Sequence, residues 1–246
     1  MQCKRALVWV VLILYSTDVG LCTLANILDN LLFLAITKIV LMPLLFVYLV
    51  LHTTPSWLLQ HVVFAVAMGF AWAGDIALLI DTDTAFYTGL GLFLMTHILY
   101  SISFIRHAKA HRVLVYVIAG VVYSSAGAIV VHFIAKVETP LVVTLVAFYT
   151  AAVASMAITA SNLNIFGAFG GLLFAISDSL IALRKFGTWS WIPEDHIVSA
   201  LMIAFYGMAQ LLLAIALIRN SRRKRVQSLD NDCSYDIPMI VRELET

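Results

Sequence analysis

Apolar runs long enough to cross a membrane follow one another through almost the whole chain. A helix needs about 20 mainly apolar residues to span the hydrocarbon core of a bilayer. Runs of this kind occupy residues 6–25, 29–51, 57–80, 86–105, 113–134, 139–160, 165–184 and 196–219. Short polar or turn-forming breaks separate them, such as "HTTPS" at 52–56 and "KVETP" at 136–140. The sequence therefore predicts an all-α integral membrane protein, a bundle of eight transmembrane helices.

The composition leaves no room for a separate soluble domain. Of the 246 residues, 62% are hydrophobic and 12% are charged, whereas soluble domains average roughly 45–50% and about 25%. We expect one transmembrane domain over residues 1–219 and a polar, disordered cytoplasmic tail over residues 220–246. Lys4 and Arg5 before the first run are also typical of a signal peptide. We favour a retained helix over residues 6–25, because apolar sequence resumes almost at once.

Basic residues are divided unevenly between the two ends of the predicted helices. Eight helices put both termini on one side, which carries Lys4, Arg5, Arg106, Lys109, Arg112, Arg219, Arg222, Arg223, Lys224 and Arg225. The opposite side carries Lys136, Arg184 and Lys185. Because cytoplasmic loops are enriched in Lys and Arg, both termini are predicted to be cytoplasmic.

The remaining composition indicates no cofactor and no nucleic-acid partner. Cys3, Cys22 and Cys233 are far apart and lack the spacing of a metal site or a disulfide framework. A net charge of +1 gives no indication of nucleic-acid binding. An oligomer is compatible with the sequence, which specifies no oligomeric state.

Several ionisable residues interrupt the apolar runs at similar depth. Asp75 lies six residues before Asp81, and Asp178 six before Arg184, so both carboxyl groups should lie roughly 9 Å below the same end of the bundle. By the same reasoning, three further polar side chains lie about 14–17 Å from that end. They are Lys38, His97 and Tyr206. Intramembrane ionisable residues usually face the bundle interior and mark a site. We therefore expect a polar site in this slab of the membrane.

Other polar residues share helix faces with this group. Tyr206 and Gln210 are one turn apart, as are His97 and Tyr100, and Ser177 is next to Asp178. Asp18 is a weaker member, because the ends of the first helix are uncertain in the sequence. An alternative is a buried ion-pair network that only fixes helix packing. We interpret Asp81 and Asp83 as solvated loop residues.

A faint internal repeat accompanies the two aspartates. "GDIALL" at 74–79 and "SDSLIAL" at 177–183 occupy the third helix in each successive group of four. Four is an even number, so the two segments would run in the same direction, as in a parallel four-plus-four repeat. The rest of the two halves does not align by eye.

Five segments in order resemble a known family. They are "TKIVLMP" at 37–43, "GDIALL" at 74–79, "GLGLFLMTHILYSISF" at 89–104, "FAISDSLIALRKF" at 174–186 and "FYGMAQLLLA" at 205–214. Together they resemble the lysoplasmalogenase family of eight-helix membrane proteins, also called YhhN-like, and are most similar to its animal members. The resemblance covers about residues 37 to 214 and includes neither the first helix nor the tail.

The resemblance implies a hydrolase acting on lysoplasmalogens, the 1-alkenyl lysophospholipids with choline or ethanolamine headgroups. The products would be a fatty aldehyde and glycerophosphocholine or glycerophosphoethanolamine, and the location would be the endoplasmic reticulum. The two aspartates of the family's GD and SD motifs correspond to Asp75 and Asp178. Residues predicted to bind or position substrate are Lys38, His97, Tyr100, Tyr149, Ser177, Tyr206 and Gln210. The expected partners are the lysophospholipid substrate and bilayer lipids.

The chemistry suits two buried carboxyl groups. A vinyl ether is cleaved when its β-carbon is protonated, which requires a carboxylic acid that keeps its proton near neutral pH, as burial allows. A second, ionised carboxylate can stabilise the cation and activate water. We favour Asp178 as the acid. Two alternatives stay open: an ion-coupled transporter of lipids or small molecules, and a non-catalytic lipid-binding protein.

Overall fold

The prediction of eight membrane-length helices is confirmed by the structure, a computed structural model that describes residues 2–53, 58–105, 113–186 and 196–244. The helices in these ranges are α1 (Gln2–Ile27), α2 (Leu31–Thr53), α3 (Leu59–Ala77), α4 (Asp83–Ile105), α5 (Val113–Ile134), α6 (Pro140–Leu163), α7 (Ile165–Lys185) and α8 (His196–Leu244). The part of α8 apolar enough to span a membrane is His196–Arg223. The separate tail from residue 220 and the four-plus-four repeat stay predictions.

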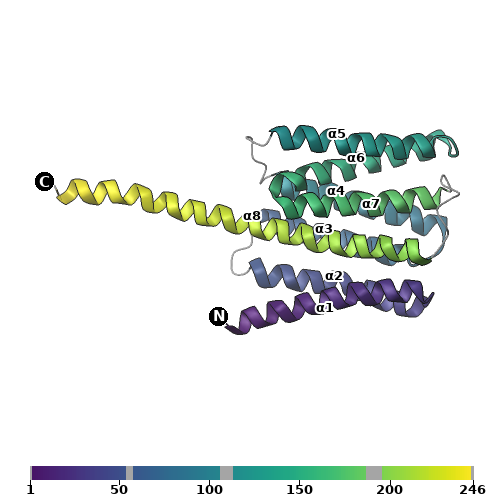
Figure 1. The fold of residues 1–246 in the computed structure, drawn as a ribbon, viewed down its shortest axis with the longest axis horizontal. Helices are drawn as coiled ribbons and strands as arrows, with labels where there is room; N and C mark the ends of the chain where they lie inside the picture. Colours follow the sequence, from purple (N-terminus) through teal and green to yellow (C-terminus); the bar gives the residue numbers. More distant parts are fainter. Residues whose placement is uncertain (1, 54–57, 106–112, 187–195, 245–246) are drawn as a thin grey trace.

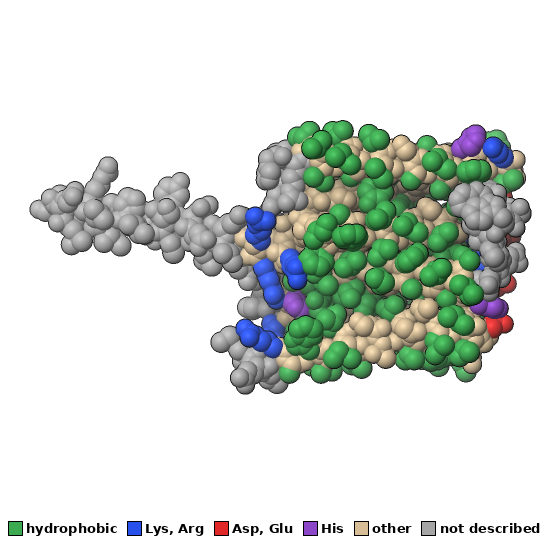
Figure 2. Space-filling model, in the orientation of Figure 1, with side chains coloured by type: hydrophobic (Ala, Val, Ile, Leu, Met, Phe, Trp, Pro, Cys, Tyr) green, Lys and Arg blue, Asp and Glu red, His purple; other side chains and the backbone are tan. Residues whose placement is uncertain are grey.

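The helices form one bundle with its hydrophobic surface turned outward. α1 and α2 lie at one edge and α5 and α6 toward the other, with α3, α4, α7 and α8 between them (Figure 1). Apolar side chains cover the visible flank of the bundle, whereas Lys and Arg gather at the end from which α8 extends (Figure 2). The N-terminus lies at that same end (Figure 1). An apolar flank between polar ends is what a bilayer requires of a spanning bundle.

A proline in α2 is compensated by its neighbour α3. Pro43 has no N–H, so the carbonyl of Ile39, one turn earlier, loses its helical partner. The indole Nε1 of Trp72 donates to that carbonyl at 2.9 Å. Since hydrocarbon offers no other donor, this bond satisfies a backbone group that would otherwise be costly. It also fixes α2 against the helix that carries Asp75.

A single residue turns the chain between α6 and α7. Asn164 is extended, and its side-chain oxygen accepts hydrogen bonds from the backbone N–H groups of Phe166 and Gly167 at 3.0 and 3.3 Å. Its side-chain nitrogen donates to the carbonyl of Ala216 on α8 at 2.9 Å. Asn164 is thus an N-cap that also attaches the turn to a third helix.

Glycine lets α7 approach α6 closely. A Cβ at Gly171 would lie 2.9 Å from the Cα of Ala157, closer than two carbon atoms can pack. Small residues at helix contacts are a common means of bringing membrane helices together. The close contact brings the residues of α7 within reach of the tyrosine on α6 described below.

Candidate active site

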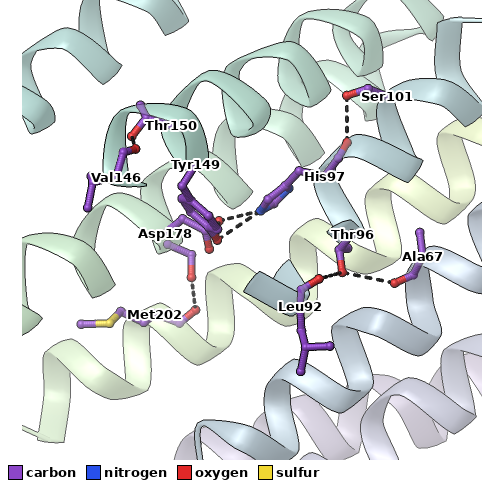
Figure 3. Close-up of polar contacts among 11 residues, drawn as sticks. Ala67, Leu92, Thr96, His97, Ser101, Val146, Tyr149, Thr150, Asp178 and Met202 are labelled. Carbon is purple, nitrogen blue, oxygen red and sulfur yellow. Dashed lines mark hydrogen bonds and ion pairs between the residues drawn. The ribbon is translucent and has the colours of Figure 1, made fainter. Parts of the chain in front are cut away.

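Asp178 accepts hydrogen bonds from two other helices (Figure 3). The hydroxyl of Tyr149 on α6 donates to its Oδ2 at 2.7 Å, and Nε2 of His97 on α4 lies 2.9 Å from the same oxygen. The carboxyl group is only 8% exposed, and His97 is completely buried. Hydrogen bonds to a charged group are the stronger ones. The two donors therefore fix the orientation of the Asp178 carboxyl group.

The surroundings of His97 favour its neutral form with the hydrogen on Nε2. Its Nδ1 is buried and has no hydrogen-bond partner among the described residues, so a second ring proton there would be unsatisfied. The ring of Phe174 packs edge-on against the imidazole, with centroids 4.8 Å apart. The hydroxyl of Ser101 donates to the backbone carbonyl of His97 at 2.8 Å (Figure 3). A neutral His97 donates Nε2–H to Asp178.

Asp75 accepts its hydrogen bond from a different helix, α8. It is 3% exposed on α3, and the hydroxyl of Tyr206 on α8 donates to its Oδ2 at 2.7 Å. The neighbouring Gly74 has no side chain, and a Cβ there would lie 2.9 Å from a ring carbon of Phe93 on α4. The Phe93 ring also packs edge-on against Tyr206, with centroids 5.9 Å apart. Asp75 and its tyrosine are thus walled by an aromatic ring.

One cavity connects the two aspartates. It has a volume of about 440 Å³ and is lined at its inner end by Lys38, Asp75, Asp178 and Tyr206. This volume falls within the range of small-molecule sites, about 300–1,000 Å³. We call it the aspartate cavity. It allows one small molecule to meet both carboxyl groups.

Lys38 on α2 is the basic residue at the inner end of the aspartate cavity. It is partly buried, and its charge acts favourably on the Asp75 carboxylate. Neither group forms a direct ion pair within the ranges that the structure describes. Lys38 is therefore near enough to stabilise a negative charge on Asp75, although the two side chains are not in direct contact as an ion pair.

The outer end of the aspartate cavity lies at the end of the bundle opposite the termini. Its polar lining there comes from helix ends and turns: Asn26, Asp81, Thr82, Arg184, Lys185 and Ser199. A smaller pocket of about 50 Å³ adjoins the cavity at Asp178 and is lined mainly by apolar residues of α4, α5, α6 and α7. A lipid-like molecule thus finds a polar opening and an apolar wall at one site.

Three of the expected residues point elsewhere. Ser177 lines the aspartate cavity, but its hydroxyl donates to the carbonyl of Met202 on α8 at 3.0 Å. Tyr100 donates to Oε1 of Gln210 at 2.7 Å, and neither residue lines the aspartate cavity or the smaller pocket. These two instead connect α4 to α8. Their separation from the carboxyl groups argues for a packing role.

Some residues of the site gave no signal in the sequence. Phe93 and Phe174 pack against Tyr206 and His97, yet an aromatic residue in an apolar helix looks like any other core residue. Asp81, interpreted as a solvated loop residue, is exposed but also lines the outer end of the cavity together with Arg184. Asp81 and Arg184 lie at the ends of predicted helices, six residues after Asp75 and Asp178, and this spacing was the only sequence feature that connected them with the site.

Within the described ranges, no group of three His, Cys, Asp or Glu side chains is arranged to hold a metal ion.

Comparison with known proteins identifies the family. The model of the YhhN family matches residues 33–217, more than half of the chain. Searches of curated proteins and of solved structures gave no match. The chain therefore belongs to the YhhN family, and this membership supports a membrane hydrolase in general.

Proposed function

From its membership of the YhhN family, we propose that the chain hydrolyses the vinyl ether bond of lysoplasmalogens, with Asp75 and Asp178 as the acid/base pair. The substrates would be 1-alkenyl-glycerophosphocholine and 1-alkenyl-glycerophosphoethanolamine. The products would be a fatty aldehyde and glycerophosphocholine or glycerophosphoethanolamine. The observation that carries the proposal is that these two buried carboxyl groups, from helices far apart in the sequence, line one cavity.

The hydrogen bonds favour Asp75 as the acid, the reverse of the preference from sequence. Asp178 accepts two donors on one oxygen, whereas Asp75 accepts one. Two donors favour the ionised form more than one does. A neutral Asp75 can accept from Tyr206 on Oδ2 and keep its own proton on Oδ1. The donating and accepting groups of the reaction would then lie on different helices.

The reaction divides into proton transfer and water addition. Asp75 gives its proton to the β-carbon of the vinyl ether, and the electron pair of the double bond forms the new C–H bond. The resulting oxocarbenium ion is stabilised by the Asp178 carboxylate, while Lys38 stabilises the carboxylate left on Asp75. Water adds to the cation and gives a proton to Asp178. When the hemiacetal collapses, Asp178 gives its proton to the departing glycerol oxygen and Asp75 takes the proton of the hemiacetal hydroxyl. The aldehyde forms, one water is consumed per bond broken, and both carboxyl groups return to their starting states.

The first experiment measures aldehyde release by the purified chain from both 1-alkenyl lysophospholipids in detergent. Asp75→Asn and Asp178→Asn should each lower turnover by about 10²–10⁴-fold, as expected for lost acid/base groups. Asp29→Asn is the matched control, because Asp29 is an exposed carboxylate at the same end of the bundle, and neither it nor its neighbour His196 lines the cavity. Thermal unfolding establishes that all variants are folded.

A run in D₂O tests the chemical step itself. Protonation at the β-carbon places one deuterium on carbon 2 of the aldehyde, which immediate borohydride reduction preserves for mass spectrometry. Turnover that survives either asparagine variant would remove that residue from the mechanism. A folded wild-type chain that releases no aldehyde would favour the alternatives: flux of intact lipid into vesicles indicates a transporter, and binding without flux a lipid-binding protein. Residence in the endoplasmic reticulum, cytoplasmic termini and the closer similarity to the animal members stay predictions.

A further inference from the structure

The outer end of the aspartate cavity carries charges of both signs. Arg184 lies in the last turn of α7 and Asp81 lies in the turn between α3 and α4, and both line the cavity. Asp178 lies six residues before Arg184 on α7, and Asp75 lies six residues before Asp81, near the end of α3. The opening of the cavity therefore presents one cation and one anion to a molecule that enters toward the two aspartates. Such an arrangement is complementary to a group that itself carries both charges.

Arg184 is the cation best placed to meet an anion. Its guanidinium donates to the hydroxyl of Ser199 on α8, a neutral group, and no described carboxylate pairs with it. Lys185, in contrast, is 2.7 Å from Oδ1 of Asp83 and lies over the ring of Phe86. Lys38 lies deeper, beside Asp75. A guanidinium suits a phosphate because its planar N–H groups can donate two hydrogen bonds to it.

The spacing along α7 matches a lysophospholipid. Arg184 follows Asp178 by six residues, which is roughly 9 Å along the helix axis. In the proposed substrate, six bonds join the vinylic carbon next to the ether oxygen to the phosphorus atom. An extended chain advances about 1.2 Å per bond, so these atoms lie roughly 7 Å apart. A vinyl ether at Asp178 therefore puts the phosphate within reach of the flexible Arg184 side chain.

We propose that the outer end of the aspartate cavity is a site for a zwitterionic headgroup, with Arg184 binding the phosphate and Asp81 the ammonium group. The identity of the lipid rests on the proposed function, whereas the headgroup site rests on the charges and spacing of the opening. In choline and ethanolamine headgroups, a short ethylene unit joins the phosphate to the ammonium group. The residue that binds the ammonium group must therefore lie nearer the mouth of the cavity than the residue that binds the phosphate. Asp81 is exposed at the turn and has no ion-pair partner among the described side chains. Headgroup choice would then be set by two residues outside the acid/base pair.

The test measures binding rather than turnover, so it is independent of catalysis. The ligands are three radiolabelled 1-alkyl ether lipids, which contain no vinyl bond to cleave: an alkylglycerophosphocholine, an alkylglycerophosphate and an alkylglycerol. Their dissociation constants are measured by direct binding to the full chain in lipid nanodiscs. Arg184→Gln should weaken binding of both phosphate ligands by at least about tenfold and leave alkylglycerol binding unchanged. Arg184→Lys keeps the charge but loses the two-point hydrogen bonding of the guanidinium, so its affinity for the phosphate ligands should lie between wild type and Arg184→Gln.

Asp81 should act on the ammonium group alone. Asp81→Asn should weaken binding of the alkylglycerophosphocholine several-fold, while binding of the alkylglycerophosphate is unchanged or stronger because a repulsive charge is gone. Lys136→Gln and Asp29→Asn are the matched controls: both are exposed charges at the same end of the bundle that do not line the cavity.

Two results would overturn the headgroup site. One is equal weakening of all three ligands by Arg184→Gln, and the other is wild-type binding that does not distinguish the alkylglycerol from the phosphate lipids. Selective binding without aldehyde release would contradict the proposed function while supporting the headgroup site. Aldehyde release without headgroup selectivity would do the reverse. The two proposals can therefore fail separately.

Discussion

Replacing Tyr149 by phenylalanine removes one of the two hydrogen bonds to Asp178 and leaves the aromatic ring in place. The bond is 2.7 Å long, is buried, and ends on a carboxyl oxygen that also accepts from His97. A hydrogen bond to a charged group is worth about 1.5–3 kcal/mol. If the carboxylate is needed in the transition state, that loss lowers kcat by about 10- to 150-fold, since each 1.36 kcal/mol is tenfold.

Tyr123→Phe is the matched control for this substitution. Tyr123 is a buried tyrosine on α5 that lines neither the aspartate cavity nor the smaller pocket. Its replacement should leave aldehyde release within about twofold of wild type, because the Tyr123 hydroxyl donates to neither aspartate. Both variants are compared by kcat in detergent, with thermal unfolding as the measure of folding. A folded Tyr149→Phe chain that turns over as fast as Tyr123→Phe would refute the role given to the Asp178 hydrogen bonds.

Two further substitutions test the charge at Asp75 and the packing of α7. Lys38→Met removes the charge and keeps the side-chain length, so it should lower kcat by about tenfold and leave KM unchanged; an effect on KM alone would make Lys38 a binding residue. Gly171→Ala places a Cβ 2.9 Å from the Ala157 backbone and should destabilise the bundle by about 1–3 kcal/mol in thermal unfolding. Gly20→Ala, where a Cβ meets nothing within 4 Å, should be neutral or slightly stabilising; equal melting of the two would contradict close α6–α7 packing.

The number of helices could be predicted from sequence because length and apolarity alone decide whether a segment can span a bilayer. Helix ends were less predictable, because they depend on single capping residues. The sixth apolar run was expected to end at residue 160 and the seventh to begin at 165, yet α6 continues to Leu163. Only Asn164 leaves the helix, since its side chain caps α7 and also reaches the Ala216 carbonyl. A bond to α8 is a tertiary feature with no local signal.

Depth predicted the level of the site but not the direction of its side chains. Asp75, Asp178, Lys38 and Tyr206 were expected near one level, and all four line the aspartate cavity. Ser177 adjoins Asp178 in sequence, yet its hydroxyl donates to α8, because successive residues in a helix point about 100° apart. Rotation of each helix about its axis is set by packing against its neighbours. A single sequence does not specify that packing.

A buried ion-pair network that only fixes packing would be built differently from the arrangement around these aspartates. Charges taken out of water are costly unless each is closely paired, so a structural network would place Lys38 directly on a carboxylate. Instead, Lys38 and Asp75 line an open cavity without a direct ion pair in the described part of the chain. The hydrogen bonds to both aspartates come from tyrosines and a histidine, which orient a carboxyl group without neutralising it. Oriented carboxyl groups beside an open cavity favour a site that receives a molecule over one that only joins helices.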